Sequence, residues 1–102
     1  MQVFDLKTMT AYPYEERQKN VFHKAKEFKT LIIALSPGDK IPVCEMSSHV
    51  IFYVVEGEAE VTVDEEKITI REGQCLITKP ATLSMRTEGG VRIMGMQIVK
   101  TE

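Results

Sequence analysis

Apolar and polar residues alternate strictly in the middle of the chain. From residue 58 to 64 every second side chain is apolar, and those between are acidic or hydroxylated; the apolar positions are Ala59, Val61 and Val63. Because successive side chains of a strand point to opposite faces, this pattern predicts a strand with one buried and one solvated face. Residues 67–71 continue the pattern, and Ile68 and Ile70 are predicted to face inward.

Two continuous apolar runs precede this segment. Residues 30–36, TLIIALS, end at Pro37-Gly38, and an apolar run with these boundaries is typical of a buried strand. Residues 50–54 form the second run. Gly57 follows it and is predicted to mark a hairpin, at which the chain turns back into the next strand.

The C-terminal third predicts one more hairpin. Its strands are expected over residues 83–87 and 91–99, with the turn at Gly89-Gly90. No segment of the chain keeps a period of 3.6 residues over more than two helical turns. Short strands separated by Gly and Pro predict an all-β protein, built as an antiparallel sandwich or barrel.

Length and charge narrow the possibilities further. The 102 residues suffice for one core, so we expect an N-terminal arm or edge strand over residues 1–20 and a barrel domain over residues 21–102. The net charge of −2 argues against nucleic acid or an anionic membrane surface as a partner. No apolar run is long enough to span a bilayer, and the N-terminus is too polar for a secretory signal. We therefore expect a cytoplasmic protein.

Cysteine usage agrees with that compartment. Cys44 and Cys75 are the only cysteines, and they lie far apart without CxxC spacing. In a reducing cytosol, two free thiols are favoured over a disulfide or a metal-binding pair.

Two glycine-bounded segments resemble conserved motifs of the cupin superfamily. Gly38 and Gly57 stand where the glycines of the motif G-x5-H-x-H-x3/4-E-x6-G are expected, and a second motif is expected to begin at Gly73. The resemblance covers roughly residues 21–99. It implies a cupin-like β-barrel, an antiparallel sandwich of the jelly-roll type, and a homodimer as the usual assembly. The apolar residues Ile51, Tyr53 and Val55, together with the N-terminal arm, are candidates for the dimer interface.

The positions of the cupin metal ligands hold other residues. Cys44 and Met46 replace the two histidines of the first motif, and Val50 replaces its glutamate. The histidine of the second motif falls at Ser84 when counted from Gly73, and at Met85 when counted from Pro80. Mn, Fe, Ni and Zn prefer imidazole and carboxylate ligands, so no hard-metal cofactor is expected.

The same positions predict a pocket inside the barrel. Cys44 and Met46 are two residues apart, so in a strand they share a face. Three interpretations remain open: ordinary core packing, an apolar ligand pocket, and a soft-metal site, since thiolate and thioether favour Cu(I). The candidate pocket residues are Cys44, Met46, His49, Val50, Phe52, Val54, Ser84, Met85 and Met96.

The histidines are weaker candidates for chemistry. Strand parity turns His49 away from Val50 unless a bulge at the preceding serines returns it, so a rim position is favoured. If it reaches the pocket, its pKa near neutrality makes it the candidate acid or base. His23 is expected to be exposed or at an interface. Lys79 and Arg86 are expected to flank the barrel mouth, either solvated or holding an anionic ligand.

Three functional hypotheses follow. The leading one is a cupin-fold protein that binds a small, fairly apolar molecule in the barrel without a hard-metal centre. The first alternative is a metal-dependent cupin enzyme of the dioxygenase or isomerase type, with a non-standard site at Cys44, Met46, His49 and Met85. The second is a dimeric interaction module without ligand chemistry. Whether the protein is an enzyme is left open by the sequence.

Overall fold

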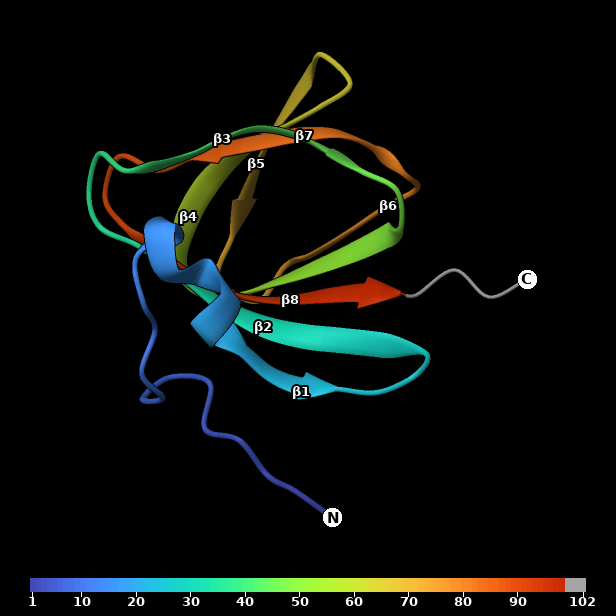
Figure 1. The fold of residues 1–102 in the computed structure, drawn as a ribbon. Helices are drawn as coiled ribbons and strands as arrows, with labels where there is room; N and C mark the ends of the chain where they lie inside the picture. The colour runs from blue at the N-terminus through green and yellow to red at the C-terminus, as the bar shows by residue number, and fades with distance from the viewer. Residues whose placement is uncertain (99–102) are drawn as a thin grey trace.

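One long strand, β4, belongs to both sheets of the molecule. The computed structural model describes residues 1–98 (Figure 1). The first half of β4 pairs with β6 and β8, and its second half pairs with β5 and β7. One sheet therefore has the strand order β1-β2-β8-β4-β6 and the other the order β3-β7-β4-β5. The strands are β1 (Val21–Lys24), β2 (Phe28–Leu35), β3 (Lys40–Met46), β4 (His49–Val63), β5 (Glu66–Arg71), β6 (Cys75–Thr78), β7 (Ala81–Arg86) and β8 (Val91–Ile98).

All pairings are antiparallel, and the two sheets curl toward each other as a barrel (Figure 1). The predicted all-β fold, a barrel of two antiparallel sheets, is therefore confirmed. Its core lies between the sheets, where Val54, Val61 and Ile93 are completely buried. Burial of these branched side chains from both sheets is the main stabilising contribution.

Gly57 bends β4 instead of ending it. Its φ of +84° lies in the left-handed region, and a Cβ placed there would lie 2.3 Å from the carbonyl oxygen of Gly90. Only glycine fits such a site without strain. The predicted hairpin at Gly57 is therefore wrong: the chain bends there, next to a register shift between Val54 and Glu56, and continues as the same strand in the other sheet.

The predicted C-terminal hairpin is also wrong. Strand β7 pairs with β3 and β4, whereas β8 pairs with β2 and β4, so the two strands belong to different sheets. The glycine-containing connection crosses from one sheet to the other. The Thr87 hydroxyl fixes this connection, since it donates to the Glu58 carbonyl at 2.7 Å and accepts from the Gly90 N–H at 3.0 Å. Residue 99, the predicted end of the last strand, lies outside the described residues.

Strand β5 follows the predicted alternation only in part. Ile70 is 3% exposed, as expected, but Ile68 is 50% exposed. Ile68 pairs with Val61, so it lies on the expected face. It is exposed because β5 is an edge strand, and near the tip of the β4–β5 hairpin no described segment covers that face.

The N-terminal segment lies against the barrel without joining either sheet. Residues 1–13 contain no strand, and a short 3₁₀ helix, η1 (Tyr14–Asn20), follows them. Arg92 on β8 donates hydrogen bonds to the carbonyls of Leu6 and Met9. Near the start of the segment, hydrogen bonds from Lys7 and Thr8 lower the pKa of Asp5.

Among the residues that the structure describes, helical structure is limited to that short element. Among residues 1–98, no helix has the length and apolar character needed to cross a membrane.

Candidate ligand cavity

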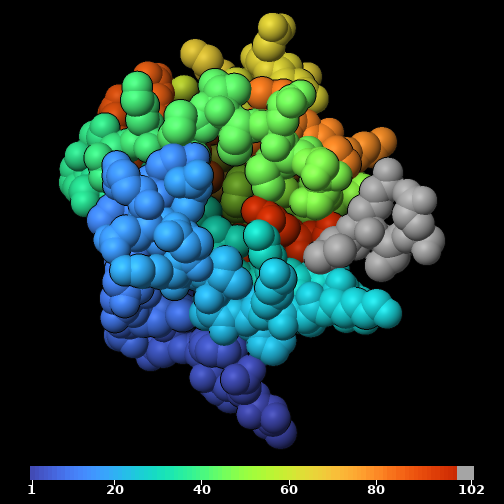
Figure 2. Space-filling model, in the orientation of Figure 1, coloured from blue at the N-terminus to red at the C-terminus, as the bar shows by residue number. Residues whose placement is uncertain are grey.

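A cavity of about 180 Å³ lies inside the barrel and is partly open to the surface. Figure 2 shows the molecule hollowed between the N-terminal segment and the region of β3 and β4. The wall is mainly apolar. Its lining residues are Tyr12, Tyr14, Arg17, Asn20, Leu31, Ile33, Ala34, Leu35, Ile41, Cys44, Met46, Val50, Phe52, Leu83, Ser84, Met85, Gly95, Met96 and Gln97.

Strands β4 and β8 form one wall. Val50 pairs with Gln97, and Phe52 pairs with Gly95, so these four positions share the inner face of the sheet. Gly95 leaves space for the aromatic ring opposite: a Cβ there would lie 3.5 Å from carbon atoms of Phe52. Val50 and Gly95 are buried, Val50 at 1% exposure.

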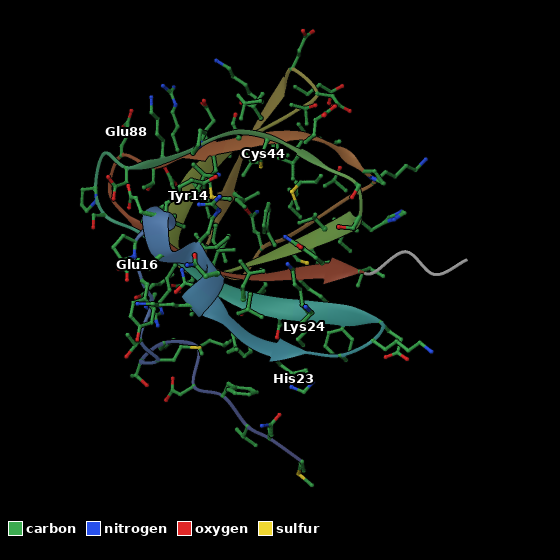
Figure 3. All side chains as sticks on the ribbon, viewed as in Figure 1. Tyr14, Glu16, His23, Lys24, Cys44 and Glu88 are labelled. Carbon is green, nitrogen blue, oxygen red and sulfur yellow. The ribbon has the colours of Figure 1, made fainter. Side chains whose placement is uncertain are left out.

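Strand β3 contributes two sulfur atoms. Cys44 and Met46 both line the cavity, and the Cys44 thiol donates to the Met46 thioether with Sγ and Sδ 3.9 Å apart. Cys44 is half-buried, whereas Cys75 is exposed on β6. Figure 3 labels Cys44 on β3 and Tyr14 on η1, two elements that border the opening of the barrel.

Strand β7 places Ser84 and Met85 on different faces. Met85 is 4% exposed and pairs with the fully buried Val61, so its side chain belongs to the interior. Ser84 pairs with Thr62, and both also line a separate outer groove. Although both residues contribute to the cavity wall, Met85 is the one on the inner face of the sheet.

Three other candidate positions differ from this group in where they lie. His49 is exposed at the start of β4 and does not line the cavity. Val54 is fully buried in the core and is not part of the cavity wall. Met96 contributes to the wall, but its cross-strand partners, Thr30 and Ile51, are on the opposite face from Val50.

The remaining basic and histidine candidates do not reach the cavity either. His23 on β1 contacts Gln2 through Nδ1 at 3.0 Å and stacks on Phe28. Arg86 forms a 3.0 Å salt bridge with Glu60, and Lys79 is exposed. Neither basic residue is among the lining residues, and both are exposed, in agreement with the solvated alternative.

The N-terminal segment supplies a part of the site that the sequence did not indicate. Tyr12, Tyr14, Arg17 and Asn20 all line the cavity. Asn20 is 5% exposed; its side chain accepts from the Tyr12 N–H at 2.7 Å and donates to the Tyr12 carbonyl at 2.9 Å. An asparagine directly before an alternating strand carries too little information to predict this double contact.

The donor set does not suit the metals of the cupin motif. The motif positions hold one thiol, two thioethers and the alkyl group of Val50. In residues 1–98, no three His, Cys, Asp or Glu side chains come together as a metal-binding group. Cys44, Met46 and Met85 are soft donors, whereas the motif metals require imidazole and carboxylate.

Comparison with known proteins places the chain in a family. The family model described as a cupin domain matches residues 31–83, which is about half of the chain. The chain belongs to the cupin superfamily. No curated protein matches this cupin in sequence.

Solved structures share the fold at low sequence identity. The TT1209 protein from Thermus thermophilus has a TM-score of 0.83 at 24% identity, covering 99% of this cupin and 100% of that chain. A cupin superfamily protein from Desulfitobacterium hafniense has a TM-score of 0.73 at 14% identity, with 78% and 74% covered. KdgF from a Halomonas species has a TM-score of 0.70 at 15% identity, with 80% and 77% covered. These likenesses concern the fold.

Proposed function

We propose that this cupin binds a small, fairly apolar molecule inside its barrel, without a hard-metal centre. The observation that supports this proposal is the partly open cavity of about 180 Å³ with its mainly apolar wall. Ligand sites combine an apolar wall with a few polar groups that orient the ligand. The residues at the metal positions make the wall more apolar, since Val50 stands where a carboxylate is expected.

The size of the cavity limits the ligand. An apolar cavity of about 150 Å³ holds benzene, so this cavity has room for one aromatic ring and a short extension. Burying such a ring in place of water is favourable by roughly 25 cal/mol per Å² of apolar surface. A single ring therefore suits the cavity better than a polycyclic or long-chain ligand.

A soft-metal site is the second candidate, and one distance favours it. The 3.9 Å between Cys44 Sγ and Met46 Sδ leaves both sulfurs able to approach one ion, and Met85 lines the same cavity. Cu(I) is the ion that thiolate and thioether donors select. The enzyme alternative that also uses His49 is weaker, because His49 is exposed and outside the cavity wall.

The thiol of Cys44 offers a direct test of occupancy. In a Cys75→Ser variant, Cys44 is the only cysteine, so its rate of reaction with a thiol reagent reports access to the cavity. We expect 2-phenylethanol, a neutral ligand with one ring, to slow this reaction in a saturable way and to raise Tm. The matched control is Cys44→Ser, in which Cys75 is the only thiol; because Cys75 does not line the cavity, its reaction rate should be the same with and without 2-phenylethanol.

Two outcomes contradict the proposal. If 2-phenylethanol changes neither Tm nor the reaction rate of Cys44, the cavity does not bind a ligand of this class. If the purified protein carries nearly one equivalent of copper by elemental mass spectrometry, and Cys44→Ser loses it, the soft-metal candidate replaces the apolar one.

We also propose that this cupin forms a homodimer through the outer face of the β6-β4-β8 region. Two cross-strand rows of mainly apolar side chains lie there, Cys75-Tyr53-Met94 and Ile77-Ile51-Met96. Ile77 is 68% and Tyr53 38% exposed, which favours a second copy as the cover. Val55, predicted to join this face, is only 7% exposed and is not available for contact. If dimerisation is the whole function, the cavity tests above fail while the dimer remains.

A further inference from the structure

We propose that the ligand is a small amphiphilic monoanion: an aromatic or short aliphatic body inside the barrel and a carboxylate at the mouth, bound by Arg17. This inference rests on the proposed function, because it names the class of molecule that the same cavity takes. It is carried by the position, the partners and the surroundings of one guanidinium group.

The charge on the cavity wall is of one sign only. Among the described residues that line the cavity, Arg17 alone carries a formal charge, and no acidic side chain lines it. A cationic ligand would therefore meet like charge at the mouth and no counter-ion inside. A neutral ligand would leave the guanidinium without a partner of opposite charge, whereas a carboxylate matches it in charge and in geometry.

Arg17 is held in place but not neutralised. Its Nη1 donates to the carbonyl of Tyr14 at 3.0 Å, and the guanidinium carbon lies 4.2 Å from the centre of the Tyr14 ring. In residues 1–98, no carboxylate forms a salt bridge with Arg17, although the neighbouring Lys19 is paired with Glu16 at 2.7 Å. A guanidinium has five N–H donors, so donors remain for a ligand.

Hydrogen bonds hold the segment that carries Arg17, both within the segment and to strand β8. Asn20 clamps the backbone of Tyr12 through two hydrogen bonds, and Arg92 holds the carbonyls of Leu6 and Met9. The charge is therefore positioned before a ligand arrives, and less conformational freedom is lost on binding.

The other basic side chains are poorer candidates. Arg71 and Arg86 are paired with Glu58 and Glu60, each at 3.0 Å, and neither lines the cavity. An anion in the barrel therefore meets Arg17 and no other cation of the described chain.

The test compares three ligands that each have one aromatic ring but differ in the charge of their polar group. Phenylacetate, 2-phenylethanol and 2-phenylethylamine are titrated calorimetrically into the intact protein, into Arg17→Gln and into Lys19→Gln. We expect phenylacetate to bind the wild type about fivefold more tightly than 2-phenylethanol, as for an ion pair near the surface, and the amine to bind least. Arg17→Gln is expected to remove the preference, while Lys19→Gln, on the same short helix, retains it.

The outcomes separate this inference from the proposed function. If phenylacetate and 2-phenylethanol bind equally well, or the amine binds best, the cavity binds ligands but the anion assignment is overturned. The same holds if the preference persists in Arg17→Gln. If none of the three ligands binds, the proposed function fails and this inference fails with it. Since Arg17 is exposed, its variant is expected to fold, and an unchanged Tm without ligand checks that.

Discussion

At the scale of residues, two glycines with nearly the same φ have different roles. Gly57 and Gly73 have φ of +84° and +83°. Around Gly73 a Cβ would meet nothing within 4 Å, whereas at Gly57 it would lie 2.3 Å from the Gly90 carbonyl oxygen. Gly73 therefore supplies only a conformation, while Gly57 also allows a close approach between two backbone segments.

Substitution of these glycines separates the two contributions. We expect Gly73→Ala to lower the free energy of unfolding by about 1 kcal/mol, the cost of a left-handed alanine. Gly57→Ala is expected to cost about 3 kcal/mol or more, because the carbonyl of Gly90 must also move. Urea denaturation measures both values. Equal losses would show that the backbone around Gly90 relaxes without cost.

The alternation of side chains between the two faces of a strand predicts part of the cavity wall. Because side chains two apart share a face, Cys44 and Met46 could be placed together from the sequence, and His49 could be placed at the rim. Parity could not decide between Ser84 and Met85, because the count depends on where the motif is taken to begin. It also could not place Arg17, since no local pattern links a short helical segment to the interior of a barrel.

At the scale of elements, the N-terminal segment is part of the binding site and its position depends on a few contacts. Asn20 is the central one, because both polar groups of its buried side chain are used by the backbone of Tyr12. Loss of these contacts leaves the backbone N–H and carbonyl of Tyr12, both in part-buried hydrogen bonds, without their partners, which destabilises the segment.

Asn20→Ala is therefore expected to loosen the segment without unfolding the barrel. Opening at Tyr12 should become easier by about 2 kcal/mol, so its backbone amide exchanges with solvent at least tenfold faster. Hydrogen exchange monitored by NMR measures this. Gln18→Ala, an exposed substitution on the same helix, serves as control. Unchanged exchange at Tyr12 in Asn20→Ala would mean that other contacts hold the segment.

The positions of the strands were easier to predict from the sequence than which strands pair with each other. The alternation over residues 58–64 and the apolar run over residues 30–36 are local signals, and except for their last residues both segments lie in strands. A glycine signal is compatible with a turn, a bend or a crossing between sheets. The hairpins expected at Gly57 and at Gly89-Gly90 failed for this reason: long-range pairing, which the local pattern does not encode, decided between these possibilities.

At the scale of the whole molecule, the fold class could be predicted from the sequence. The proposed dimer is inferred instead from the apolar residues that the structure leaves exposed. The proposed dimer face contains Ile77, and the face of edge strand β5 contains the comparably exposed Ile68. These two residues provide a matched pair for testing which apolar surface is covered in solution.

We expect light scattering to give twice the chain mass of 11.6 kDa for the wild type. Ile77→Lys should give the mass of one chain, because a lysine covered by the interface loses its hydration. Ile68→Lys should remain dimeric. Circular dichroism checks that both variants are folded. A wild type that is monomeric at all concentrations would exclude the dimer, and dissociation by Ile68→Lys alone would move the interface to the other sheet.

The strand shared by both sheets also determines how the protein unfolds. Because β4 pairs with strands on both of its sides in each sheet, neither sheet can separate from the other while β4 remains intact. Loss of β4 removes pairing partners from β5, β6, β7 and β8 at once. The barrel is therefore expected to open in a single cooperative step, in which the most protected amides of both sheets exchange with the same free energy. A ligand that binds at one end of the barrel then stabilises its far end equally.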